Sequence, residues 1–152
     1  MAQPVLAPPG AAPLALGRLV VLVRDYDTAL EFYRAAFGAR VLFDSLLPSG
    51  ERYLHLGFGS ETDDSAPIGA PGVGVWLLRA GGESATRVGR QTGGEPLAVF
   101  YTPDVRGAVA RAEAAGAALV RPVVTADGAS FAHVADLYGN VFVLVEFTPP
   151  VV

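Results

Sequence analysis

The stretch LVVLVRDYDTALEFYRAAFGARVL, from Leu19 to Leu42, encodes a strand, a helix and a second strand. The apolar run from Leu19 to Val23 predicts the first strand. Asp25 stands where a carboxylate caps a helix by accepting its free amide hydrogens, and Gly38 supplies the left-handed residue that ends the helix. Between them, apolar side chains recur at helical spacing on one face: Tyr26, Leu30, Tyr33 and Phe37. The second strand then runs from Ala39 to Phe43.

A second unit of the same kind lies between Ala98 and Leu119. An apolar strand, Leu97 to Tyr101, runs into Asp104, and an alanine-rich helix then continues up to Gly116. Two further apolar strands complete each half, at 52–58 and 73–79 in the first and at 130–135 and 141–147 in the second. The matching order of elements predicts an α+β fold made of two tandem βαβββ modules.

Composition indicates where the flexible arm, the domain and the linker begin and end. Residues 1–15 are rich in Ala and Pro and are expected to form a flexible N-terminal arm. A single domain is predicted over 16–147, with module one at 16–80, a linker at 81–94, module two at 95–147 and a tail at 148–152. The linker is rich in glycine, so it is either a plain connection or a lid.

Charge and residue usage exclude several classes of protein. The net charge is −4, and the eleven arginines are scattered along the chain, so the basic stripe of a nucleic-acid binder is missing. Cysteine and lysine are both absent, which excludes thiol chemistry, cysteine-bound zinc and Schiff-base catalysis. No apolar run reaches the roughly 18 residues of a membrane span, and the N-terminus lacks the pattern of a signal peptide. We therefore expect a cytoplasmic protein without membrane or nucleic-acid partners.

Three motifs resemble one known family. The segment from Val23 to Gly38 is similar to the opening strand and helix of vicinal oxygen chelate proteins, the glyoxalase, bleomycin resistance and extradiol dioxygenase superfamily. Pro103-Asp104-Val105 followed by an alanine-rich helix resembles the start of that family's second module. Ala135 to Asn140 is similar to its Asp-Pro-Asp-Gly-Asn turn, with Leu137 and Tyr138 in place of the proline and the second aspartate.

This resemblance implies a cup-shaped curved sheet with the helices outside, and a ligand site inside the cup. Family members often hold a metal ion there through His, Glu or Gln on the first and last strand of each module. The matching positions here are Arg18, Leu77, Leu97 and Val143. A guanidinium and three aliphatic side chains offer no donor to a divalent ion. We therefore expect neither a metal ion nor another cofactor.

His55 and His133 are the only imidazoles, so any acid or base chemistry has to involve them or a tyrosine. Strand alternation places Tyr53 and His55 on the side away from Leu54 and Leu56, toward the cup. Each histidine is either a pocket donor or base, or a half-buried residue satisfied by a neighbour or water. The predicted pocket residues are Arg18, Tyr53, His55, Leu77, Leu97, Tyr101, His133 and Val143.

Arg18 has two interpretations of its own. Its planar fork could hold an anionic ligand through parallel hydrogen bonds. Alternatively, it could pair with Glu146 near the end of the last strand.

Three functions are compatible with these observations. The first is a metal-free small-molecule binding protein, for antibiotic sequestration or metabolite binding. The second is a metal-independent lyase or isomerase that uses His55, His133 or Tyr101 as acid or base. The third is a structural or regulatory subunit whose cup is filled by its own side chains. We also expect a homodimer, because members of this family commonly pair and the chain is apolar with few charges.

Overall fold

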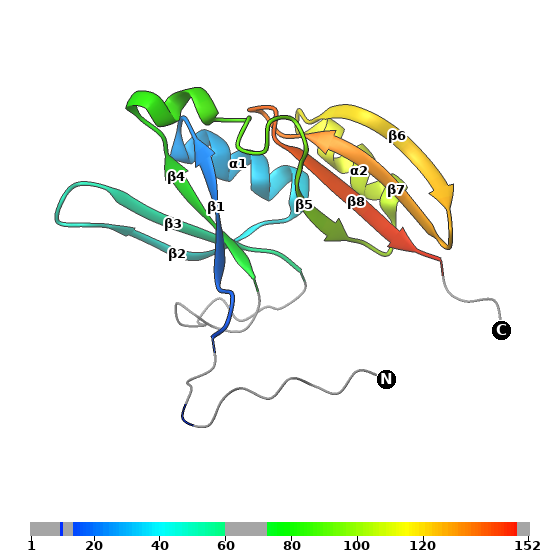
Figure 1. The fold of residues 1–152 in the computed structure, drawn as a ribbon, viewed down its shortest axis with the longest axis horizontal. Coiled ribbons are helices and arrows are strands. Elements are labelled where there is room, and N and C mark those ends of the chain that lie inside the picture. The colour runs from blue at the N-terminus through cyan, green and yellow to red at the C-terminus, as the bar shows by residue number, and fades with distance from the viewer. Residues whose placement is uncertain (1–9, 11–13, 60–72, 149–152) are drawn as a thin grey trace.

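The computed structural model describes Gly10 and residues 14–59 and 73–148. They form two βαβββ modules joined by a linker, as Figure 1 shows. Module one contains β1 (Arg18–Val23), α1 (Tyr26–Phe37), β2 (Arg40–Leu46), β3 (Arg52–Gly57) and β4 (Gly74–Arg79). Module two contains β5 (Pro96–Tyr101), α2 (Val105–Ala114), β6 (Ala118–Ala126), β7 (Ala129–Ala135) and β8 (Val141–Phe147). Most of the predicted N-terminal arm and C-terminal tail lies outside the described residues.

The two sheets have the same topology. The first sheet has the strand order β1-β4-β3-β2 and the second has β5-β8-β7-β6. The edge strand of each sheet, β1 or β5, pairs in parallel with the last strand of its own module, and the remaining pairs are antiparallel. The predicted α+β fold of two tandem βαβββ modules is therefore confirmed. Neither described helix is long and apolar enough to cross a membrane.

Both helices begin at the predicted aspartates. The Asp25 carboxylate accepts a hydrogen bond from the Thr28 amide at 2.7 Å. The Thr28 side chain, followed by this amide, holds the pKa of Asp25 below its usual value. The Asp104 carboxylate accepts from the Gly107 amide at 2.9 Å. Gly38 ends α1 with a φ of 67°, a left-handed conformation that favours glycine.

One hydrophobic core joins the modules, and α1 lies at its centre. The Phe37 ring stacks on Phe100 of β5 at 5.0 Å between centroids and meets Phe142 of β8 at 5.3 Å. Tyr33 contacts the edge of Phe142 from the same helix. Residues of both sheets thus pack against a helix that belongs to module one, and the two modules share one core cluster.

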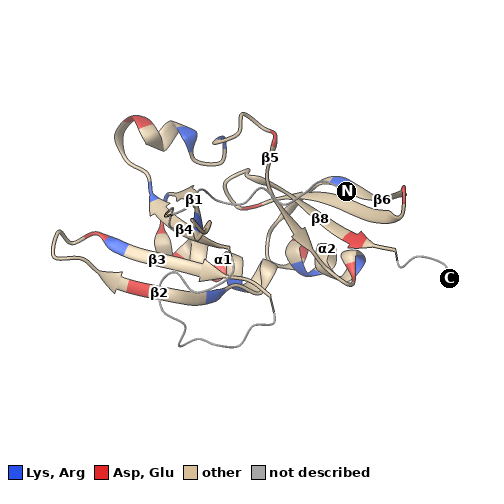
Figure 2. Cartoon of the chain, turned by 60° about the horizontal axis from the view of Figure 1, so that its bottom comes forward, with Lys and Arg blue, Asp and Glu red and all other residues tan. Residues whose placement is uncertain are grey.

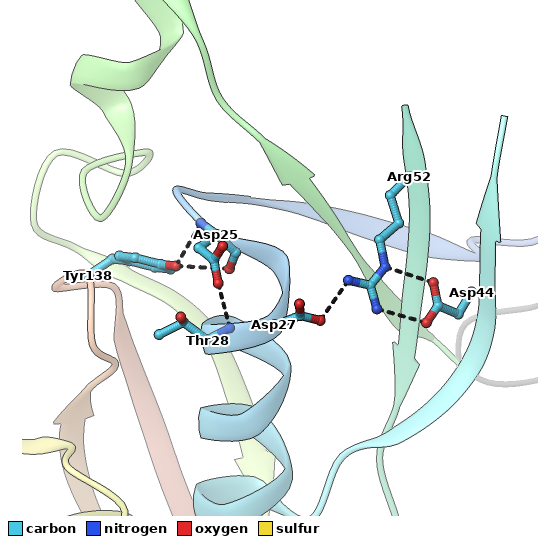
Figure 3. A network of polar contacts seen from close by, with 6 residues as sticks. All are labelled: Asp25, Asp27, Thr28, Asp44, Arg52 and Tyr138. Atoms are coloured by element: carbon cyan, nitrogen blue, oxygen red, sulfur yellow. Dashed lines mark hydrogen bonds and ion pairs between the residues drawn. The ribbon is translucent and has the colours of Figure 1, made fainter. Parts of the chain in front are cut away.

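Hydrogen bonds connect the loop between β7 and β8 to α1 and to Asp25, which precedes it. Asp136 is buried and accepts four hydrogen bonds, from the Tyr33 hydroxyl, the Tyr138 amide, and the amide and side chain of Asn140. Burial raises the pKa of the Tyr33 phenol well above its ordinary value. The Tyr138 hydroxyl lies 3.3 Å from both the amide nitrogen and the carbonyl oxygen of Asp25, as Figure 3 shows.

A surface ion network supports the other side of the α1 N-terminus. The Arg52 guanidinium on β3 binds both oxygens of Asp44 on β2 at 2.8 Å and also Asp27 on α1 at 2.8 Å (Figure 3). The hydrogen bond from Arg52 holds the pKa of Asp44 below its usual value. The network joins residues of opposite charge on the β2–β3 hairpin (Figure 2) and contributes little stability, because the Asp27 and Asp44 carboxylates are exposed.

The predicted linker is packed on the body of the domain. It forms a short 3₁₀ helix, Gly82–Arg87, and then buries Val88. The Gln91 side-chain amide accepts from the Leu22 amide at 2.7 Å and donates to the Val20 carbonyl at 2.9 Å, as a neighbouring strand would. Gly89 lies directly against the backbone of Tyr138. These contacts tie the linker to both modules.

Candidate functional site

Each sheet has one side packed in the core and one side that we call its open face. On the first sheet Val21, Leu54 and Leu77 share the core side, because Val21 and Leu54 are both register partners of Leu77 and all three are buried. Strand alternation turns the intervening residues to the open face. The open face of the first sheet includes Arg18, Phe43, Tyr53, His55 and Trp76.

The prediction that Leu77 lines the pocket is therefore wrong. Leu77 is fully buried in the core, whereas Trp76 is the register partner of His55. In the second sheet Val143 is the partner of His133, so Trp76 corresponds to Val143 and Leu77 to Leu144. Counting along the first module missed this position by one residue, and a shift of one residue moves a side chain to the other face of a strand.

His55 lies at the centre of the first open face. It is only 8% exposed, and its Nδ1 accepts a hydrogen bond from Arg18 Nε at 3.2 Å. Its ring is surrounded by Trp76 at 5.8 Å, Tyr53 at 5.8 Å and Phe43 at 5.9 Å between centroids. Burial, followed by the nearby Arg18 charge, lowers the pKa of His55, so the imidazole is neutral near pH 7.

Arg18 holds His55 and does not pair with Glu146. Its Nη1 donates to the Gly17 carbonyl at 2.7 Å, while Nε is engaged with the imidazole. Glu146 accepts instead from the Val105 amide at the start of α2, at 3.0 Å. Of the two interpretations of Arg18, the pair with Glu146 is therefore not formed, and an anion could use only the part of the guanidinium that these two bonds leave free.

Three buried side-chain donors lack a hydrogen-bond partner among the described residues, and all belong to the first sheet. They are His55 Nε2, Trp76 Nε1 and Arg40 Nε. An unpaired buried donor costs about 1–3 kcal/mol, so most folded proteins satisfy such groups. Trp76 also lies 5.2 Å from the Tyr53 ring. The first open face therefore combines aromatic surface with unsatisfied N–H groups.

The other predicted pocket residues lie on the second sheet. Its open face includes Leu97, Tyr101, His133 and Val143. These residues alternate along their strands with Phe142, Leu144 and their register partners, which lie on the core side. Tyr101 is 73% exposed and lies 5.4 Å from the ring of Phe147. Burial and the Arg121 charge lower the pKa of His133. The structure thus divides the predicted pocket between two separate sheets.

A cleft of about 210 Å³ lies between the edge strands of the two sheets. Val20 on β1 and Leu97 and Val99 on β5 contribute its open-face lining, and Tyr33 and Phe58 lie deeper. The lining is almost entirely apolar. Of the predicted residues only Leu97 belongs to it, so this cleft can bind an apolar group and contains no catalytic side chain among the described residues.

Comparison with known proteins identifies the family. The family model of the glyoxalase/bleomycin resistance protein/dioxygenase superfamily matches residues 15–144, which include both modules. The chain belongs to this superfamily. An uncharacterized protein of Shewanella frigidimarina is 28% identical over 130 residues, which cover 84% of this chain and 90% of that protein.

Several solved structures share the fold at low sequence identity. UcmS2 superposes with a TM-score of 0.71 at 22% identity, covering 89% of this chain and 99% of that one. TnmS3, an antibiotic binding protein from Streptomyces sp. CB03234, superposes with a TM-score of 0.67 at 21% identity, covering 91% and 99%. TioX from Micromonospora sp. ML1 has a TM-score of 0.60 at 22% identity, covering 88% and 98%.

The residues of this chain do not fit the metal site of the superfamily's metal-dependent members. On the first sheet, the one imidazole accepts a hydrogen bond from Arg18 through Nδ1, and its Nε2 carries the proton. On the second sheet, Leu97 and Val143 are aliphatic. The described residues contain no group of three side chains able to hold a metal ion.

Two open-face residues escaped the sequence analysis. Trp76 lies in an apolar strand, where nothing in the local pattern marks it as an open-face residue. Phe43 follows a bulge between Val41 and Phe43 that alters alternation on β2. Trp76 is equivalent to Val143, the register partner of His133, and this equivalence becomes visible only once the strand pairing is known. No local pattern marked the bulge.

Proposed function

We propose that this protein binds a small organic molecule, in antibiotic sequestration or metabolite binding, without a resident metal ion. The observation that supports the proposal best is the first open face, where three aromatic rings surround an imidazole with an unpartnered N–H. Apolar sites with a few placed polar groups are typical of ligand pockets. The fold similarity to the antibiotic binding protein TnmS3 is in line with this function.

The chemistry of His55 favours binding over catalysis. A general base needs a free lone pair, and the lone pair on Nδ1 is already used by Arg18. Tyr101 is mostly solvent-exposed, where the water-excluded surroundings of a catalytic acid are missing. A subunit with a filled cup is also disfavoured, because Val99 is 51% exposed on the second open face.

A thermal-shift screen tests the proposal. We expect at least one compound of an antibiotic and metabolite library to raise the melting temperature, because a ligand of the native state at 100 times its Kd adds about 2.7 kcal/mol. The same screen with Zn²⁺, Ni²⁺, Mn²⁺ or a chelator is expected to leave the melting temperature unchanged. Elemental analysis that finds about one equivalent of a transition metal per purified chain, together with a chelator-sensitive melting temperature, would contradict metal-free function.

We further propose that the protein is a homodimer in solution. The open face of the second sheet exposes several large apolar side chains that water disfavours: Val99, Tyr101, Val124 and Phe147. Exposed apolar patches of this kind mark interaction surfaces, and a second copy of the chain is the partner most readily available.

Light scattering is expected to give twice the chain mass of 15.7 kDa at micromolar concentration. The double substitution Val99→Glu and Tyr101→Glu should shift the protein toward monomer, because it places two charges in the apolar patch. The control Glu83→Gln, in the 3₁₀ helix of the linker, should leave the mass unchanged. A monomeric wild-type protein at these concentrations would exclude the dimer.

A further inference from the structure

The hydrogen bond between Arg18 and His55 decides which imidazole nitrogen carries the proton. A guanidinium can only donate, so Nδ1 of His55 must be the acceptor and must be unprotonated. A neutral imidazole then carries its proton on Nε2. Neutrality follows from burial and from the Arg18 charge, which both lower the pKa of His55. Arg18 thus selects a single tautomer.

A second donor without a partner belongs to the neighbouring strand β4. Trp76 is the register partner of His55 across β3 and β4, its ring centroid is 5.8 Å from the imidazole, and the two planes meet at 39°. An indole N–H is only a donor. Both His55 Nε2 and Trp76 Nε1 are buried and lack an acceptor among the described residues. An acceptor from outside the described residues would therefore stabilise both donors, because burying a donor without a partner costs free energy.

We propose that His55 Nε2–H and Trp76 Nε1–H form a donor-only clamp for an acceptor oxygen of an aromatic ligand, with Arg18 as the positioning residue that fixes the His55 tautomer. This inference rests on the proposed function and specifies its ligand class. The aromatic part of the ligand packs against Tyr53 and Phe43, which flank the imidazole. The acceptor is a carbonyl, phenolate or carboxylate oxygen, because a hydroxyl that only donates has no partner in the clamp.

The chain contains a single tryptophan, so its indole N–H gives one signal in a proton–nitrogen correlation spectrum. Three probes with the same ring system separate the acceptor from the aromatic surface: 1-naphthoate, 1-acetonaphthone and 1-methylnaphthalene. We expect the two probes with an acceptor oxygen to bind about tenfold more tightly than 1-methylnaphthalene, as one or two hydrogen bonds allow. They should also move the Trp76 indole proton downfield.

Substitutions test each part of the clamp. His55→Phe should abolish the preference for acceptor probes while 1-methylnaphthalene binds as before. Arg18→Met should weaken the preference, raise the pKa of His55 and produce a mixture of tautomers in the imidazole nitrogen spectrum. The matched control is Arg121→Met, which removes the charge beside His133 in the second sheet and should leave the Trp76 signal and the probe preference unchanged.

Equal affinity for all three probes in the wild-type protein would overturn the clamp while leaving small-molecule binding intact. An unshifted indole signal with every probe, together with hits elsewhere in the thermal-shift screen, would place the ligand on another surface and also reject the clamp. A screen without any hit rejects the proposed function itself. Retention of a single Nε2–H tautomer in Arg18→Met would show that Arg18 is not the positioning residue.

Discussion

Replacement of Gly89 by alanine is expected to lower the free energy of unfolding by about 3 kcal/mol or more, the sum of a backbone clash and a strained conformation. A Cβ at this position would lie 1.8 Å from the Tyr138 carbonyl oxygen and 2.6 Å from its carbon. Both are backbone atoms of the β7–β8 loop, which hydrogen bonds to Asp136 hold in place. Neither the linker nor the β7–β8 loop can move away without breaking the contact between them.

Gly93→Ala is the matched control for this substitution. Gly89 has a φ of 76° and Gly93 a φ of 69°, so an alanine is strained to the same degree in both, but nothing lies within 4 Å of a Cβ at Gly93. The control should cost only about 1 kcal/mol, the price of the left-handed conformation. Urea denaturation of both variants measures the difference, provided that the m-value is unchanged. Equal losses would mean that the linker does not press on the Tyr138 backbone in solution.

The contact at Gly89 shows where sequence reasoning ends. Strands, helices and capping aspartates could be predicted because each depends on residues within a few positions of one another, and the duplication followed from their matching order in the two halves. Gly89 contacts the backbone of Tyr138, 49 residues away, and a glycine has no side chain from which this contact could be predicted. The linker was therefore expected to be a plain connection or a lid, whereas it packs on both modules.

The candidate site was predictable in part for a related reason. Alternation around Leu54 and Leu56 correctly placed Tyr53 and His55 on the open face, because both signals lie within one strand. Leu77 was assigned to the wrong face, since β4 follows residues 60–72 and its register with β3 is not encoded in its own sequence. Trp76 could be placed only once the β3–β4 pairing was known.

Arg18 illustrates how a substituted ligand position acquires another role. The sequence shows a cation where metal-dependent relatives place a metal ligand, and a free anion-binding fork was one reasonable interpretation. Its actual partner, His55, is 37 residues away and belongs to a different strand. The Arg18 guanidinium thus binds the His55 imidazole, and we expect it to influence a bound ligand mainly by fixing the tautomer of His55.

Asp136→Ala is the second substitution with a large expected effect, a loss of about 3 kcal/mol or more in the free energy of unfolding. It would remove the acceptor for four hydrogen bonds and leave the Tyr33 hydroxyl, the Asn140 side chain and two backbone amides without partners. Asp136 is 5% exposed and Asn140 is 3% exposed, so water cannot easily replace the lost carboxylate. The same loop holds Tyr138 against the start of α1, and loosening it weakens the contact between modules.

Two further variants separate the polar network from a general effect of losing an aspartate. Asp27→Ala removes a carboxylate that is 83% exposed and paired with Arg52, and it should cost less than about 1 kcal/mol. Tyr33→Phe removes one of the four donors and keeps the packing against Phe142, so about 1–2 kcal/mol is expected. If Asp136→Ala and Asp27→Ala lower stability equally in urea denaturation, the loop between β7 and β8 does not hold the modules together through its buried carboxylate.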